Sequence, residues 1–392
     1  MKKALVLVLL LTLGLYLAAE TTFSTKGVLR TRTAMYNYFG EDAPTHSYID
    51  SRLRMSFIGA FSEKLKAVWQ VEVGDVKWGK ESTGGDLDTD GINVETKHAY
   101  LNFICPNSGV DITVGLQRFE DHNSLVMGAD FAAFMFAKNF DFGKVQFGTG
   151  KIYEGDYTED DDDDLFFLNY YGKNFGIENI LRRQMGGDWY DIWFMPYFVY
   201  QMNDLIFDLQ AIYNYGSYTL ADEYRADDEI TNGGYGVNLK IKYAKDFKLG
   251  FEVLYVSGDD GEDSESTSVF NTILEYNFNG LEIYGRGIHD GQQIGWNGPG
   301  NGAMGAMNFI LTGEYPIKED LKLKAAFGYL NTVEENANEE TNLGMEADLG
   351  ICWKIYQPLT FDLVGAYAMP NEDFYDDSDS VYELSSRIQY KF

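Results

Sequence analysis

The sequence contains little cysteine, proline or histidine, and it lacks long apolar segments after its first residues. It holds two cysteines, Cys105 and Cys352, seven prolines and four histidines among 392 residues. Two cysteines so far apart do not make the disulfide framework of a small secreted domain, and we expect no disulfide between them. After Leu17, no segment approaches the roughly 20 apolar residues of a membrane-spanning helix. An α-helical membrane protein is therefore not expected.

Basic residues and catalytic patterns are also scarce. Lys and Arg number 31 against 61 Asp and Glu, a formal charge of −30, so nucleic acid is not an expected partner. The histidines are His46, His98, His122 and His289, and no His-Glu-x-x-His, Gly-x-Ser-x-Gly or Cys-x-x-Cys pattern occurs. A hydrolase would need a nucleophile or base placed beside a histidine. We therefore expect neither an enzyme nor a required cofactor.

The first residues have the pattern of an export signal. Lys2 and Lys3 precede the uncharged run Ala4–Leu17, and Ala18-Ala19-Glu20 offers a cleavage point after Ala19. The sequence thus predicts a signal peptide over residues 1–19 and one domain over residues 20–392.

Aromatic residues and glycine are abundant. There are 28 Tyr, 27 Phe and 41 Gly, at a mean hydropathy of −0.27. This composition suits strands that are apolar on one face, with aromatic girdles at membrane interfaces. The segment Tyr48–Val73 shows the pattern best, because apolar residues alternate with charged or polar ones on both sides of the turn Ser62–Lys64. The apolar face would meet a second sheet in a soluble sandwich, or lipid in an outer-membrane barrel.

The order of connections favours the barrel. Short turns, such as Pro106–Gly109 and Asn277–Gly280, alternate with long acidic segments, such as Asp75–Val94 and Leu220–Asn232. We expect an all-β, transmembrane, antiparallel up-and-down β-barrel with short periplasmic turns and long acidic extracellular loops. The segments suggest about 16–20 strands. Twenty is the best count, and 18 and 16 are the alternatives, because the assignment of 131–140 and 179–185 is ambiguous.

Three segments carry a resemblance to bacterial outer-membrane porins. Residues 383–392 alternate and end in Phe392, which resembles the closing strand of such barrels. Residues 51–54 with 65–72 resemble the second and third strands of general porins, and 99–101 followed by 114–118 resembles their entry to the third loop. A weaker resemblance, through residues 256–260, is to alginate-export channels. The porin resemblance implies a homotrimer in the outer membrane of a diderm bacterium, embedded in outer-membrane lipid.

The alternation of side chains between the two faces of each strand predicts which residues line the pore. If the apolar face meets lipid, the charged face of the first strands points inward, and alternation is enforced because a lipid-facing Arg or Lys costs about 2–4 kcal/mol at the midplane. The resemblance adds acidic residues of the third loop opposite this basic ladder. The predicted pore-lining residues are Lys26, Arg30, Arg32, Asp50, Arg52, Arg54, Lys66, Gln70, Glu72, Arg118, Glu120 and Asp121. The same residues could instead only pair their charges along the wall.

The predicted function is a porin, a water-filled channel for passive diffusion of ions and small hydrophilic solutes. Acidic loops such as Glu159–Asp164 would attract cations at the mouth, which predicts cation preference. The alternatives are a structural or surface-interaction barrel and a channel specific for sugars or oligosaccharides. Asp86, Asp88 and Asp90 alternate before Gly91 like the first half of a calcium loop, which suggests a Ca²⁺ site, although Lys97 stands where the closing glutamate is expected.

Overall fold

A computed structural model describes residues 21–37, 39, 44–86, 93–154, 162–184, 189–219, 229–261, 266–275, 279–288, 302–375 and 379–392. The predicted signal peptide lies outside the described residues. No helix in the described part of the chain is long and apolar enough to cross a membrane.

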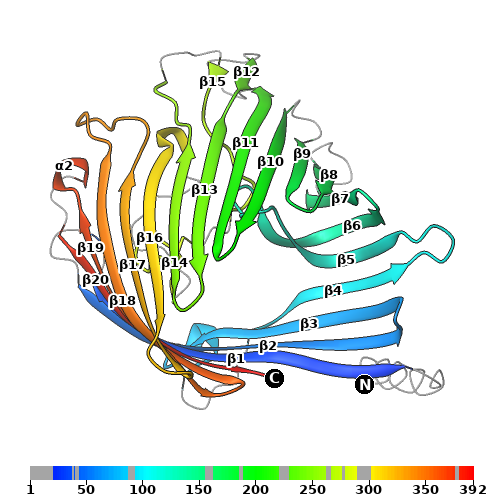
Figure 1. The fold of residues 1–392 in the computed structure, drawn as a ribbon, viewed down its shortest axis with the longest axis horizontal. Coiled ribbons are helices and arrows are strands. Elements are labelled where there is room, and N and C mark those ends of the chain that lie inside the picture. The colour runs from blue at the N-terminus through cyan, green and yellow to red at the C-terminus, as the bar shows by residue number, and fades with distance from the viewer. Residues whose placement is uncertain are drawn as a thin grey trace.

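Nearly all of the described chain is β-strand (Figure 1). The strands are β1 (Thr22–Asn37), β2 (Thr45–Ser62), β3 (Leu65–Lys77), β4 (Val94–Ile104), β5 (Asp111–Glu120), β6 (Gly128–Phe140), β7 (Gly143–Tyr153), β8 (Asp163–Tyr171), β9 (Phe175–Gln184), β10 (Trp189–Met202), β11 (Leu205–Thr219), β12 (Glu229–Asn232), β13 (Tyr235–Ala244), β14 (Lys248–Val256), β15 (Ser266–Thr267), β16 (Ala306–Pro316), β17 (Leu321–Asn331), β18 (Asn342–Tyr356), β19 (Leu359–Pro370) and β20 (Val381–Lys391). The short helices are η1 (Glu81–Thr83), η2 (Gly302–Met304) and α2 (Glu372–Tyr375).

Among the described residues, eighteen strands form one closed antiparallel wall, and the short strands β12 and β15 lie outside it. Each wall strand pairs with the next, and β20 pairs with β1, from Val28 opposite Lys391 to Tyr36 opposite Glu383. Below this ladder the backbones of Gly27 and Phe392 exchange two hydrogen bonds of 2.7 and 3.0 Å. The all-β barrel is confirmed with eighteen wall strands, which was an alternative to the best count of twenty.

The strand count differs from twenty at one particular place. Both ambiguous segments are wall strands, β6 and β9. However, the segments on either side of the predicted turn Asn277–Gly280 are not wall strands, and they belong to the connection from β14 to β16. Leu281, Ile283 and Tyr284 in this connection are fully buried inside the barrel. Their apolar side chains pack against the inner wall. A segment that packs one face against the inner wall needs apolar residues on that face, which gives the same alternating sequence pattern as a lipid-facing strand.

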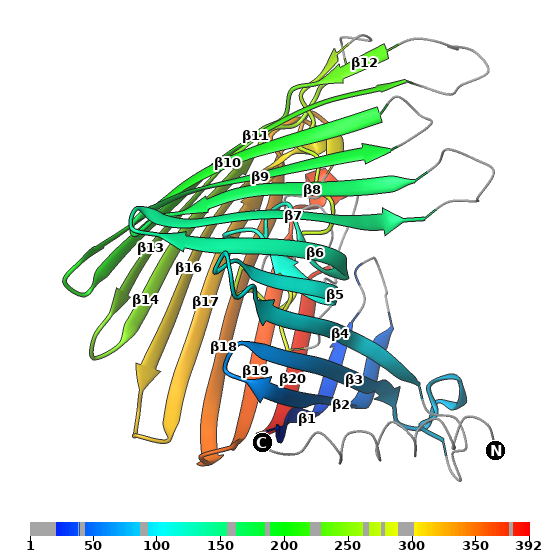
Figure 2. The same cartoon turned by 90° about the vertical axis from the view of Figure 1, so that its right-hand side faces the viewer.

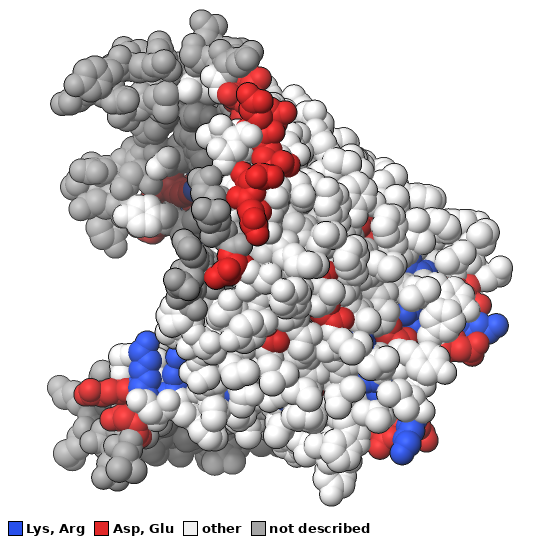
Figure 3. Space-filling model, turned by 90° about the vertical axis from the view of Figure 1, so that its left-hand side faces the viewer, with Lys and Arg blue, Asp and Glu red and all other residues white. Residues whose placement is uncertain are grey.

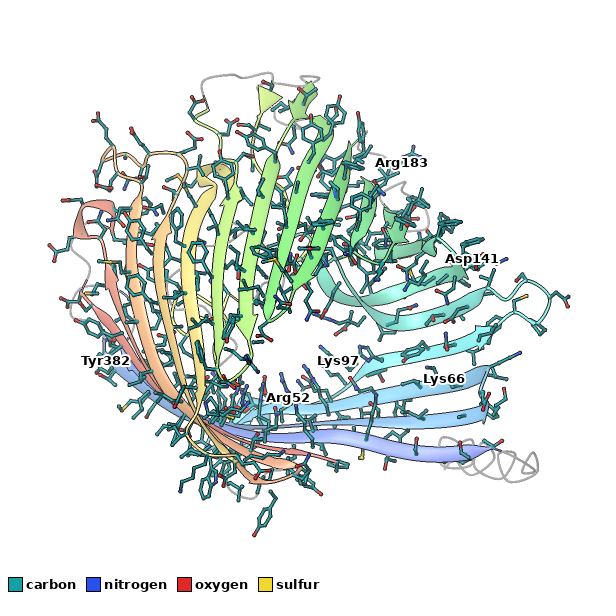
Figure 4. All side chains as sticks on the ribbon, in the orientation of Figure 1. Arg52, Lys66, Lys97, Asp141, Arg183 and Tyr382 are labelled. Carbon is teal, nitrogen blue, oxygen red and sulfur yellow. The ribbon has the colours of Figure 1, made fainter. Side chains whose placement is uncertain are left out.

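Alternation along the wall separates two environments. In the hairpin of β2 and β3, Phe57 lies opposite Trp69, and the two rings stack at 5.5 Å on the outer face. Ser56 and Glu72, on the other face, are 2% and 6% exposed. Figure 4 shows Arg52 pointing into the ring of strands and Tyr382 projecting from its outer side. In this hairpin the outer face is therefore apolar and the inner face polar, as a barrel in lipid requires.

Charged side chains gather at the ends of the barrel. Figure 2 shows the short turns between wall strands at one end of the barrel, and the described longer connections, such as residues 332–341 between β17 and β18, lie at the other. In Figure 3, Asp and Glu form a band beside the long connections, and a broad area with few charges separates it from the opposite end. Glu335 and Glu339 after β17, and Glu372 and Asp373 after β19, are exposed at the end with long connections.

Candidate functional site

Two connections fold into the barrel and contact each other. One is residues 121–127, between β5 and β6, and the other joins β14 to β16. The N–H groups of Ile273 and Leu274 donate to Val126 O at 3.0 and 3.1 Å, and Gly128 N donates to Leu274 O at 2.7 Å. Val126 and Met127 are buried in an apolar cluster with inner-wall side chains such as Trp193. The two connections therefore form one hydrogen-bonded body that narrows the lumen.

A cavity of about 660 Å³ lies between the second connection and the wall, toward the end with short turns. Its wall residues come from β11, β13, β14, β16 to β20, β1 and β2. Seven basic side chains line it: Arg30, Arg52, Lys242, Lys248, Arg286, Lys324 and Arg387. Four acidic ones do so: Glu282, Glu314, Asp348 and Asp362. The chain is strongly acidic as a whole, yet this cavity has more basic than acidic groups.

Strand register explains how the basic groups come together. Arg30 lies opposite Arg52 in the pairing of β1 with β2, and Arg32 lies opposite both Asp50 and Arg387. Arg32 makes a buried ion pair with Asp50 at 2.7 Å. Like charges on neighbouring strands repel, so this arrangement is stable only with carboxylates nearby.

Two carboxylates supply most of that compensation. Asp75 Oδ1 lies 2.7 Å from Arg30 Nη2, and Asp75 Oδ2 lies 3.6 Å from Arg52 Nη1. Asp362 lies 3.0 Å from Arg387 and 3.5 Å from Lys324. The sequence predictions missed both. Strict alternation after Val73 would turn Asp75 outward, so it seemed to start a loop. A bulge in β3 beside Gly74, whose φ is +126°, shifts the alternation and brings Asp75 to the inner face.

The other residues predicted to line the pore are more scattered. Arg54 pairs with Glu72, and Gln70 donates to Ser56 at 2.7 Å. Lys26 and Lys66 are exposed near the short-turn end. Glu120 pairs with Arg118 at 2.6 Å. The pore-lining set as a whole stays a prediction.

Asp121 has a role within its own connection. It is 2% exposed, and its carboxylate accepts the N–H groups of Leu125, Val126 and Met127 at 3.1, 3.0 and 2.7 Å. In the described part of the chain, neither Asp121 nor Glu120 contacts an arginine of β1 or β2. That these two side chains stand opposite the basic ladder across the lumen stays a prediction.

The predicted calcium site is only partly described. Asp88 and Asp90 lie outside the described residues, and Asp86 follows η1. No group of three or more His, Cys, Asp or Glu residues within the described ranges could hold a metal ion. Calcium binding thus stays a prediction. Cys105 and Cys352 are both free thiols in the structure.

The comparison with known proteins rests on structure. No family model and no curated protein matches the sequence. Among solved structures, OccAB1 of Acinetobacter baumannii is 10% identical with a TM-score of 0.58, over 94% of this chain and 97% of that one. OccK9 (OpdG) of Pseudomonas aeruginosa is 9% identical with a TM-score of 0.60, over 94% and 98%. OpdK of the same organism, solved with vanillate, is 12% identical with a TM-score of 0.57, over 94% and 98%.

These neighbours are outer-membrane porins, which are not enzymes. At identities of 9% to 12% the likeness establishes the fold. The chain therefore has the fold of a bacterial outer-membrane porin, a closed antiparallel up-and-down β-barrel.

Proposed function

We propose that this protein is an outer-membrane channel for passive diffusion of small hydrophilic solutes, and that its basic cavity contacts the anionic group of a solute. The observation that carries the proposal is the excess of arginine and lysine around an inner cavity of about 660 Å³. Arginine binds carboxylates through paired N–H donors, so a carboxylate is the group that this lining fits best.

One structural neighbour supports the choice of solute. OpdK was solved with vanillate, which is an aromatic carboxylate. OpdK shares the barrel fold of this chain at 12% identity. The cavity described above is large enough for a molecule of this size.

Cation preference, expected from the acidic loops, stays a separate prediction. Exposed carboxylates such as Glu335, Glu339 and Asp373 would concentrate cations at the mouth. The basic cavity would favour anions further inside. The reversal potential in a KCl gradient tells which region controls ion selectivity. A reversal potential close to the equilibrium potential of potassium supports control by the acidic loops, and one close to that of chloride supports control by the basic cavity.

The test is conductance of the purified protein in a planar bilayer. We expect steady single-channel currents in KCl that vanillate blocks and that vanillyl alcohol, its uncharged counterpart, blocks far less. A sealed surface-interaction barrel would give no current. A sugar-specific channel would be blocked by sugars and would not distinguish vanillate from vanillyl alcohol. The homotrimer implied by the porin resemblance is tested by cross-linking in membranes.

A further inference from the structure

The turn formed by residues 281–288, here called the brace, is tied to the wall mainly through one buried carboxylate, and Glu282 N also lies 3.3 Å from Asp348 Oδ2. Glu346 lies on the inner face of β18 and is fully buried. Its oxygens accept three successive backbone N–H groups of the brace, from Glu282 at 2.8 Å, Ile283 at 2.7 Å and Tyr284 at 2.7 Å. A carboxylate is the side chain that can accept three such donors at once.

A second tie joins the brace to β1. Arg32 Nη1 donates to Ile288 O at 3.0 Å, while Ile288 N donates to the Glu282 side chain at 2.6 Å. The Tyr284 hydroxyl also donates to Leu343 O on β18 at 2.8 Å. The brace is therefore fixed at both ends, and its geometry depends on Glu346 at one end and on Arg32 at the other.

Between these ties the brace carries Arg286, which lines the basic cavity. The flanking residues are Gly285 and Gly287, and a Cβ on Gly287 would lie 1.8 Å from Glu282 Oε2. The turn is thus too tight for side chains on either side of the arginine. In the described part of the chain, Arg286 is the only basic residue of the cavity that a connection supplies, because the other six belong to wall strands.

The geometry points to Arg286 as a solute-contacting, specificity-determining residue, and to Glu346 as the residue that positions it. This inference rests on the proposed function and deepens it. Glu346 is absent from the cavity lining, so it can affect the solute through the brace or through its charge, but not as a lining side chain. The ligand class is a small organic carboxylate, here represented by vanillate.

The sign of the Glu346 effect separates positioning from simple electrostatics. Replacing Glu346 by Gln removes a negative charge near the cavity, which by charge alone should strengthen block by an anion. If Glu346 positions Arg286, the same change should weaken block. Gln keeps one oxygen, which can accept the N–H groups of Glu282 and Ile283, but its N–H₂ would face the N–H of Tyr284 and cannot accept it. The two explanations therefore predict opposite results.

The experiment measures vanillate block of KCl currents for the full-length protein in bilayers. We expect R286Q to weaken block about tenfold, the order expected when one hydrogen bond to a charged group is lost. E346Q should weaken block to a similar extent, E346D should recover part of it, and the double variant should be no weaker than R286Q alone. The matched control is E252Q, the same Glu-to-Gln change on the inner face of β14, at a residue that bonds to Asn238 and Lys240 and neither lines the cavity nor bonds to the brace. It should strengthen block slightly or leave it unchanged.

Heat-modified migration on gels would show that each variant still forms a barrel. Unchanged block in R286Q, in a wild-type channel that vanillate blocks, would overturn the role of Arg286 and leave the proposed function intact. Stronger block in E346Q, or additive loss in the double variant, would overturn the positioning role. An absence of current, or of vanillate block, in the wild type would instead count against the proposed function itself.

Discussion

Replacing Leu311 by arginine tests whether the outer wall lies in hydrocarbon. Leu311 is the central residue of β16, is 50% exposed, and lies opposite Phe251 and Phe327, both also exposed. Tyr315, near the end of the strand, is 60% exposed and fits an interfacial aromatic girdle. Leu311 is thus placed near the middle of the apolar band.

The expected cost follows from this position. An arginine on the lipid face costs about 2–4 kcal/mol at the bilayer midplane and about 0–1 kcal/mol near the interfaces. For L311R we expect about 3 kcal/mol, which is roughly a hundredfold shift in the folding equilibrium. The assay is reversible folding into lipid vesicles across a urea series, compared with the wild-type protein.

The matched control is N107R, in the exposed turn between β4 and β5. An exposed turn position should tolerate the same new side chain within about 0.5 kcal/mol. A loss for L311R as small as that of N107R would refute the assignment of the outer wall to lipid. A large loss for both would instead indicate a general effect of added arginine.

Two further predictions concern groups outside the wall strands. D121A should release the connection 121–127 from its folded position, because three buried N–H groups lose their acceptor. Each unpaired N–H costs up to about 1–3 kcal/mol, and less where water in the lumen can bind it. Conductance should rise while the melting temperature of the barrel changes little, and unchanged conductance would contradict a narrowing role. Burial, and then the nearby Asp260, Asp259 and Glu335, raise the pKa of Glu334 above its usual value. A raised carboxyl pKa favours folding while the group is protonated and loses that advantage as pH rises, so E334Q should be slightly more stable than the wild type at neutral pH and equal to it at about pH 4. A difference that persists in acid would show another cause.

Local patterns predicted the wall well. The hairpin of β2 and β3 could be placed because every second residue must suit lipid, and that demand is visible in any short segment. The same demand identified β20 at the end of the chain. These predictions needed no knowledge of which distant strands meet.

The interior was harder to predict because it depends on distant contacts. Arg30 and Arg32 are correctly placed on the inner face by alternation, but their partners Asp75 and Asp50 depend on register and on a bulge. The brace resembled a strand because Leu281 and Ile283 alternate with polar residues. Nothing local shows that its apolar face meets the inside of the wall, since the acceptor that holds it, Glu346, is about sixty residues away.

The pairing of β20 with β1 has a consequence for how the molecule is made. β1 gains its second neighbour in the wall only when β20, far from it along the chain, arrives. Gly27 is so close to Phe392 that a Cβ there would lie 2.6 Å from the ring. Until then, any partial wall has two edge strands with unpaired backbone N–H and C=O groups. The hydrocarbon of the bilayer offers these groups no hydrogen-bond partners. Entry into the bilayer should therefore be a late, concerted event, and shortened chains that lack β20 should stay outside it.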